Sequence, residues 1–128
     1  MTAPVLDTSV VIDVLRGSAP ATRWLSSLDA VPVCSEVTRT EVLRGVRSAE
    51  RAPTERLLQA LRWIAVDERV SRRAGELGRR YRGSHRGLGV ADLLIAATAL
   101  ELGAEVATAN LRHFPMFAGL RTPYEDHA

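Results

Sequence analysis

Residues 89–108, GVADLLIAATALELGAEVAT, decide the fold of this chain. The part from Asp92 to Leu102 is almost wholly apolar, which predicts a buried helix. Gly103 stands where helices commonly stop, in the position that favours a left-handed residue. The run from Glu105 to Thr108 is short and apolar, and predicts a strand. A buried helix followed at once by a strand is typical of α/β proteins.

The same alternation extends over the rest of the chain. Strands are predicted at residues 5–6 and 31–34. Helices are predicted at 10–16, at 20–28, from 38 to about 45–47, and at 70–82. A further helix is predicted after Pro53-Thr54, because Leu57, Leu58, Leu61 and Ile64 follow at helical spacing. Residues 83–89 form a glycine-rich loop, and 110–117 a turn or short helix. Without a linker or repeat, we expect one domain spanning residues 1–128, with a parallel sheet covered on both faces.

The composition is that of an ordinary globular protein. The chain has 128 residues, of which 46% are hydrophobic and 25% charged. Cys34 is the only cysteine, so no internal disulfide is possible, and we expect a buried, inert thiol. The sequence has no apolar run of transmembrane length and no secretion signal. We therefore expect a cytoplasmic protein without membrane contact.

The basic residues exclude several mechanisms. All 17 are arginine, and the net charge is only +2. Without lysine there can be no lysine nucleophile, Schiff base or phosphate-loop lysine. Phosphoryl-transfer domains with an aspartate at a strand end usually need such a lysine, which makes them improbable here. The glycine-rich loop lacks the spacing and the preceding strand of a dinucleotide site.

Two carboxylates stand at the boundaries of predicted elements. Asp7 follows the first strand and could be catalytic, or could cap the next helix, although Thr8 or Ser9 would cap it equally well. Asp92 lies in the first turn of the apolar helix. A charge at the head of a buried helix is unfavourable unless it is paired or bound to a cation.

Glu41 has a complete structural alternative. The sequence Thr38-x-x-Glu41 matches a capping box, and Val37 with Val42 could form the accompanying hydrophobic staple. We nevertheless expect Glu41, in the first turn of its helix, to face the same sheet edge as Asp7 and Asp92. In doubly wound folds, ligands bind outside the carboxyl ends of the strands.

Three carboxylates at one edge would repel one another, and a divalent cation would resolve that repulsion. Ligands that are all oxygens favour Mg²⁺ or Mn²⁺ over zinc. His85, His113 and His127 are scattered without zinc-ligand spacing, and we expect them at the surface. Magnesium held by carboxylates commonly serves phosphodiester hydrolysis.

Three motifs in register now show a family resemblance. Leu6-Asp7-Thr8-Ser9-Val10-Val11-Ile12-Asp13, Thr38-Arg39-Thr40-Glu41-Val42-Leu43-Arg44-Gly45 and Val90-Ala91-Asp92-Leu93-Leu94-Ile95-Ala96-Ala97-Thr98-Ala99 resemble the motifs of PIN-domain proteins. The best match is with VapC-type toxins of bacterial toxin–antitoxin pairs. The ending Ala107-Thr108-Ala109-Asn110-Leu111-Arg112-His113-Phe114 fits as well, and the resemblance covers essentially the whole chain.

The resemblance implies a three-layer α/β/α sandwich with a central, mostly parallel sheet. It implies a Mg²⁺-dependent endoribonuclease, with Mn²⁺ as a possible substitute, that leaves a 5′-phosphate and a 3′-hydroxyl. Dimerisation and inhibition by a small cognate antitoxin are also implied. Asp7, Glu41 and Asp92 carry over as metal-binding and catalytic acids, and Ser9 and Thr108 as polar residues that position ligands or water.

One departure concerns the stretch after the last strand. Many members place a further aspartate there, where this chain has Asn110 and His113. We therefore expect one tightly bound Mg²⁺, with any second ion dependent on substrate phosphate. Asn110 could still hydrogen-bond a water at the metal.

The residues that would bind the substrate form no motif as specific as those around the three acids. The segment 69–86 holds Arg79, Arg80, Arg82 and Arg86, which could bind RNA phosphates, while Tyr81 could stack on a base. Alternatively, these arginines simply form the solvent-exposed face of a helix. Structured RNA such as tRNA is the expected substrate class.

We expect the antitoxin to insert an arginine between the carboxylates. Trp24 and Leu25 could form a groove for its helix, or could be core or dimer contacts. The alternative to a nuclease is a PIN-like domain that binds RNA or a partner with little or no cleavage.

Overall fold

A computed structural model describes residues 3–83 and 88–125 and contains a four-stranded parallel sheet in the order β3-β2-β1-β4. The strands are β1 (Val5–Leu6), β2 (Val33–Ser35), β3 (Arg62–Ile64) and β4 (Val106–Ala107). The helices are α1 (Thr8–Leu15), α2 (Ala19–Ser26), α3 (Glu36–Arg44), α4 (Arg51–Gln59), α5 (Glu68–Tyr81) and α6 (Val90–Leu102), with 3₁₀ turns η1 (Ser48–Glu50) and η2 (Leu111–His113).

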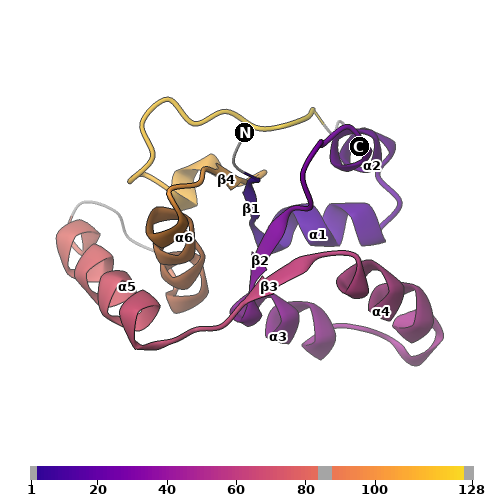
Figure 1. The fold of residues 1–128 in the computed structure, drawn as a ribbon, viewed down its shortest axis with the longest axis horizontal. Coiled ribbons are helices and arrows are strands. Elements are labelled where there is room, and N and C mark those ends of the chain that lie inside the picture. Colours follow the sequence, from indigo (N-terminus) through magenta and orange to yellow (C-terminus); the bar gives the residue numbers. More distant parts are fainter. Residues whose placement is uncertain (1–2, 84–87, 126–128) are drawn as a thin grey trace.

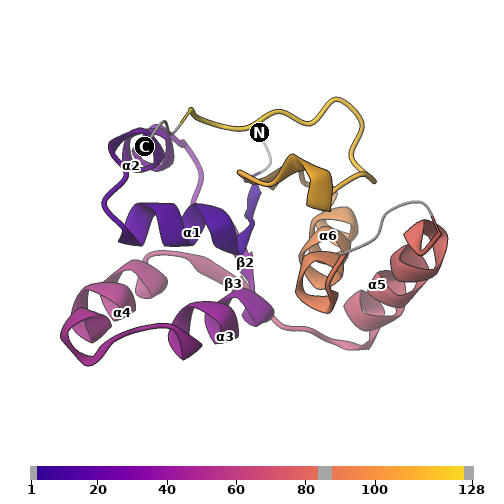
Figure 2. The same cartoon turned by 180° about the vertical axis from the view of Figure 1, so that it is seen from behind.

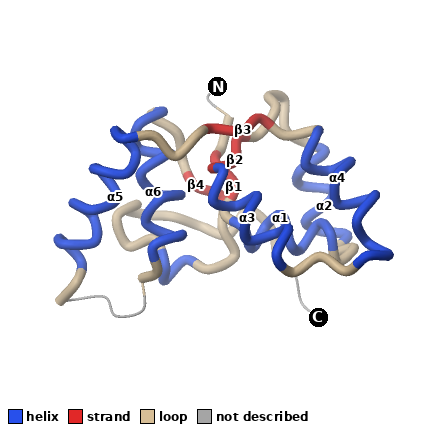
Figure 3. The backbone as a smooth tube through the Cα atoms, turned by 90° about the horizontal axis from the view of Figure 1, so that it is seen from below, coloured by secondary structure: helices blue, strands red, loops and turns tan. Residues whose placement is uncertain are grey.

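Helices cover both faces of this sheet, as expected for a three-layer α/β/α sandwich. Figures 1 and 2 show α5 and α6 on one side of the strands, and α1, α2 and α4 on the other. Seen from below in Figure 3, the strands lie between these two groups of helices. Successive strand residues enter different cores: Val5 packs with α5 and α6, whereas Leu6 packs with α1 and α4. This alternation is what a sheet buried on both faces requires.

The order of the strands defines a switch point at the carboxyl ends of β1 and β4, which we call the crevice. From β1 the chain moves outward to β2 and β3, and it returns to the other side of β1 as β4. The point where the order reverses therefore lies between β1 and β4, and ligands of open α/β sheets bind at such points. Asp7 follows β1 directly and Thr108 follows β4 directly, which places both at this crevice.

Several predicted boundaries were wrong. The helical spacing from Leu57 to Ile64 hid a break at Leu61, after which residues 62–64 form the edge strand β3. Helix α4 begins at Arg51 and so contains Pro53, which is tolerated in a first helical turn. Helix α3 begins at Glu36 rather than Thr38.

Two other expectations about the interior hold. Gly103 ends α6 in the left-handed conformation, with φ of 65°. Cys34 is fully buried, and this burial raises the pKa of its thiol to about 12, as expected of an inert cysteine. Among the residues described, no helix has the length and apolarity needed to cross a membrane.

Candidate active site

Asp7 is a buried carboxylate held in place by two hydroxyl groups. Its side chain belongs to a residue only 3% exposed, and the Oδ2 atom accepts hydrogen bonds from Ser9 Oγ and Thr108 Oγ1, each at 2.7 Å. Asp7 occupies the position before α1, but its side chain makes no capping hydrogen bond to that helix. The capping alternative for Asp7 is therefore wrong. The folded structure thus fixes the orientation of the Asp7 carboxylate through the uncharged hydroxyl groups of Ser9 and Thr108.

The loop after β4 is tied to the same carboxylate. Thr108 is fully buried, and its Oγ1 accepts the backbone N–H of Asn110 at 2.9 Å while it donates to Asp7. Ser9 Oγ accepts the backbone N–H of Ala109 at 3.2 Å. The predicted polar residues Ser9 and Thr108 thus orient Asp7, while Asn110 stands exposed at the start of η2.

Glu41 is held by a threonine pair rather than by a capping box. Helix α3 begins at Glu36 and is capped by Ser35, which accepts the N–H of Val37, so Glu41 lies in the second turn. The Oε1 atom of Glu41 accepts a hydrogen bond from Thr8 Oγ1 at 2.6 Å, and Thr8 also contacts the buried Thr38 at 3.0 Å.

The capping-box alternative for Glu41, with its staple, and the predicted first-turn position of Glu41 were therefore wrong. Thr8 and Thr38 instead link α1 to α3 and anchor the Glu41 carboxylate. Nothing in the sequence marked this pair, because the two threonines meet only when the helices pack.

Asp92 is the carboxylate with the most unfavourable electrostatic surroundings. It lies in the first turn of α6, as predicted, and its side chain is 20% exposed. Burial raises the pKa of Asp92, and the negative charges of Asp7 and Glu41 raise it further. His113 and the backbone N–H of Gly89 act in the opposite direction. Asp92 is therefore close enough to Asp7 and to Glu41 to be repelled by both.

His113 belongs to this crevice, although the sequence suggested a surface position. Its Nδ1 atom lies 3.2 Å from Oδ2 of Asp92, and the side chain is partly exposed. The 3₁₀ turn η2 brings it there after β4. His85 and His127 lie outside the described residues.

The donor set suits a hard divalent cation. Three carboxylates face a crevice in which Asp92 carries unfavourable negative charge, and oxygen ligands favour Mg²⁺ or Mn²⁺. In the described part of the chain, however, no three His, Cys, Asp or Glu side chains lie together as a group that could hold one metal ion, so fewer than three of them would bind it directly. Water or substrate oxygens would have to complete the coordination shell, as Mg²⁺ commonly requires.

The arginines of the predicted RNA-binding segment divide into two groups. Arg69 and Arg73 pair with Glu101 of α6, and Arg72 pairs with Glu68 one turn away. These ion pairs hold helices together or lie along one helix. Three others, Arg79, Arg80 and Arg82, are exposed at the end of α5, and Arg86 lies outside the described residues.

Trp24 and Leu25 pack inward. Both are half-buried against the core on the α1 and α4 side, and the Trp24 ring lies 6.1 Å from that of Tyr124. Of the roles that the sequence left open for these two residues, their packing fits the role of core residues.

Comparison with known proteins agrees with the fold and the motifs. The PIN-domain family model matches residues 5–119. Two proteins of Mycobacterium tuberculosis are similar over 94% of this chain: ribonuclease VapC19, at 44% identity over 98% of its length, and ribonuclease VapC10, at 43% over 92%. A toxin–antitoxin complex from Klebsiella pneumoniae contains a chain with a TM-score of 0.83 and 27% identity, covering 96% of this chain and 99% of its own length. The chain therefore belongs to the PIN-domain family, among the VapC ribonucleases.

Proposed function

We propose that this chain is a Mg²⁺-dependent endoribonuclease, that it acts as the toxin of a toxin–antitoxin pair, and that Asp7, Glu41 and Asp92 are its metal-binding and catalytic acids. The observation that supports the assignment is the arrangement of the acids: Asp7 and Glu41 are held by hydroxyl groups, and Asp92 lies near enough to both that their charges add to the effect of burial in raising its pKa. A cation there would relieve the repulsion. The ribonuclease relatives supply the reaction class.

Each acid has a separate task in this proposal. Asp7 and Asp92 would hold Mg²⁺, or Mn²⁺ in its place, through carboxylate oxygens. When bound, the ion would polarise the scissile phosphate and favour deprotonation of the attacking water. Glu41, fixed by its hydrogen bond from Thr8, would orient that water and accept its proton.

The auxiliary residues keep this arrangement in place. Ser9 and Thr108 hold the Asp7 carboxylate in one orientation, which spares the site a reorganisation during the reaction. Asn110, exposed at the mouth of the crevice, would hydrogen-bond a water at the ion. Since neither Asn110 nor His113 is a carboxylate, we propose one tightly bound ion, with any second ion dependent on substrate phosphate.

The substrate class is structured RNA with a single-stranded loop, such as tRNA. The exposed Arg79, Arg80 and Arg82 on α5, together with Arg86, would bind its backbone phosphates. Within the described residues, the ion pairs of this segment occupy the arginines near the start of α5 and leave those at its end available, which supports this role.

A small cognate antitoxin is the proposed protein partner. The similar Klebsiella pneumoniae chain comes from a toxin–antitoxin complex. The three clustered acids would accept an arginine of the antitoxin in place of the metal, since guanidinium pairs bidentately with carboxylates. We further propose a homodimer that acts in the cytoplasm.

A metal titration separates the nuclease from a PIN-like domain that only binds RNA or a partner. Purified protein is incubated with a panel of small RNAs, at increasing Mg²⁺ or with chelator. The nuclease proposal expects discrete products that need Mg²⁺ and disappear with chelator. RNA binding that survives chelator without Mg²⁺-dependent products would refute it.

A further inference from the structure

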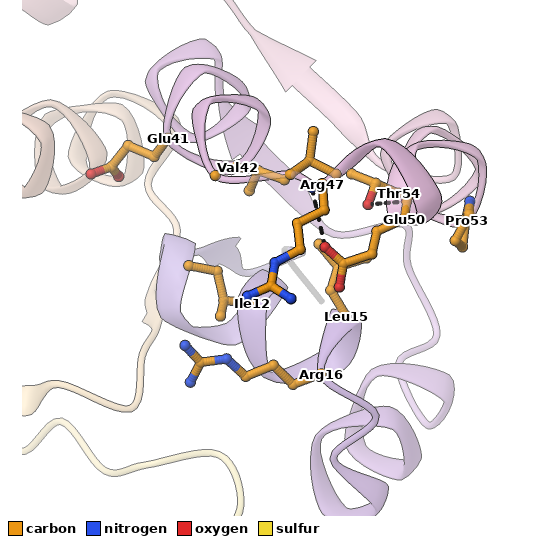
Figure 4. A pocket seen from close by; sticks show the side chains of 11 residues that line it. Ile12, Leu15, Arg16, Glu41, Val42, Arg47, Glu50, Pro53 and Thr54 are labelled. Atoms are coloured by element: carbon orange, nitrogen blue, oxygen red, sulfur yellow. Dashed lines mark hydrogen bonds between the residues drawn. The ribbon is translucent and has the colours of Figure 1, made fainter.

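A cavity of about 550 Å³ opens beside Glu41, between α1, α3, η1 and α4. Figure 4 shows Arg16 at the end of α1 and Arg47 after α3, whose side chains reach into it from opposite walls. Ile12, Leu15 and Val42 contribute apolar surface between them. Glu41 lines this cavity and also belongs to the carboxylate cluster, so the two spaces are neighbours.

The two arginines of the cavity differ from those on α5 in their partners. Arg69 and Arg73 share an ion pair with Glu101, and Arg72 pairs with Glu68. Among the ion pairs formed within the described residues, none involves Arg16 or Arg47. The Glu50 carboxylate beside Arg47 accepts that residue's backbone N–H at 3.1 Å. Both arginines are exposed and available to an anion.

We propose that this cavity is a nucleotide subsite of the RNA-binding path, an inference that rests on the proposed nuclease function. Arg16 and Arg47 bind a backbone phosphate adjacent to the one that is cut, and the base lies on the apolar floor. The volume falls in the range of clefts that hold small ligands, about 300–1,000 Å³. Guanidinium is the side chain best matched to phosphate, because its planar fork can donate two hydrogen bonds.

Charge and shape favour RNA over a helix of a protein partner at this place. An amphipathic helix binds along a continuous apolar groove, with anchors spaced over several turns. Here Arg16 and Arg47 reach over a short apolar floor, with Glu50 beside Arg47. Glu41 at one end connects the cavity to the other carboxylates of the site. We place the phosphate next to the scissile one at these arginines because Glu41 lines the cavity and also belongs to the carboxylate cluster.

The test compares two double variants that remove the same charge. R16A/R47A changes the cavity, whereas R44A/R51A removes two exposed arginines on α3 and α4 that do not line it. Both are made in the Asp7→Asn protein, so that RNA is bound but not cut. The probe is a ladder of mixed-sequence single-stranded oligoribonucleotides, shortened one nucleotide at a time, and the dissociation constant is measured over a range of salt.

We expect R16A/R47A to weaken binding about tenfold or more relative to R44A/R51A. The salt dependence should fall by about one unit of slope for each phosphate that the variant no longer binds. The difference should vanish for oligonucleotides too short to reach the cavity. R16K/R47K should keep the salt slope, and thermal unfolding verifies that every variant is folded.

Equal RNA affinities of R16A/R47A and R44A/R51A would overturn the proposed subsite. This result would leave the nuclease proposal intact if the chain without substitutions cuts RNA. Loss of antitoxin inhibition by R16A/R47A, with RNA binding unchanged, would also overturn it and assign the cavity to the protein partner. Absence of any metal-dependent cleavage by the unmodified chain would refute the nuclease, and with it the subsite.

Discussion

Asp7 and Asp92 stand on two walls of one crevice, and their surroundings are opposite. Asp7 is buried and accepts two short hydrogen bonds from hydroxyl groups of Ser9 and Thr108. Asp92 is half-buried, has a raised pKa and finds its nearest opposite charge only when His113 is protonated. The β1 wall is thus organised by folding, whereas our proposal needs a cation to complete the α6 wall.

This contrast predicts that the α6 side of the site lowers the stability of the folded protein. A charge with an upward-shifted pKa destabilises the folded protein wherever that charge is ionised. Removal of the two carboxylates should therefore have the same effect on activity and opposite effects on stability.

The largest effect is expected on cleavage. Asp92→Asn should reduce the rate of RNA cleavage by more than about 100-fold, because a metal ligand matters more than the outer groups that orient it. Glu41→Gln should also reduce the rate, with RNA affinity largely kept. Single-turnover rates and dissociation constants at saturating Mg²⁺ measure both. Arg44→Ala, outside the crevice, is the matched control and should cleave normally.

The second prediction concerns stability without metal. Asp7→Ala should lower the free energy of unfolding by about 1–3 kcal/mol, because Thr108 loses its buried acceptor. Asp92→Asn should raise it by roughly 0.5–2 kcal/mol, as is common when a functional site is relieved of strain. Denaturant unfolding in the presence of chelator gives both values. Destabilisation by Asp92→Asn would contradict the contrast between the two walls.

The contrast between Asp7 and Asp92 also predicts that the free energy of unfolding depends on pH. The pKa of Asp92 is higher in the folded protein than in the unfolded chain, so the folded state binds more protons between the two values. Stability contributed by Asp92 is therefore present below the unfolded pKa and is lost as pH rises through the folded pKa. In chelator, the stability gain of Asp92→Asn should grow with pH over this range. A gain that stays constant with pH would show that the carboxylate's charge is not the cause.

The smallest effect is expected from the groups that orient Asp7. Thr108→Val keeps the shape of the side chain but removes the donor, and should weaken Mn²⁺ binding by about 10- to 100-fold. Ser9→Ala should have a smaller effect, since Thr108 remains. Titration calorimetry with Mn²⁺ measures both, and equal affinities in all three proteins would show that Asp7 needs no such support.

The sequence predicted the strands β1, β2 and β4 and the long helices because their apolar periodicity is clear. It missed β3, since Leu57, Leu58, Leu61 and Ile64 continue a helical spacing across the break. For an edge strand of three residues, the local pattern is too short to oppose the preceding helix.

At the site, the motifs that resemble those of PIN-domain proteins predicted Asp7, Glu41 and Asp92 as the acids but did not reveal the hydrogen bonds that hold Asp7 and Glu41. Thr8 reaches Glu41 across 33 positions of the chain, and Thr108 reaches Asp7 across 101. Such hydrogen bonds depend on how α1, α3 and β4 pack. His113 was missed for the same reason, because only the turn η2 directs it to Asp92.

The most direct test of the carboxylate site is a cleavage map of total RNA, comparing the unmodified chain with Asp7→Asn in Mg²⁺ and in chelator. We predict a small set of discrete cuts by the unmodified chain that need Mg²⁺ and are absent with Asp7→Asn. The same cuts made by Asp7→Asn, or by the unmodified chain in chelator, would contradict the assignment of the site.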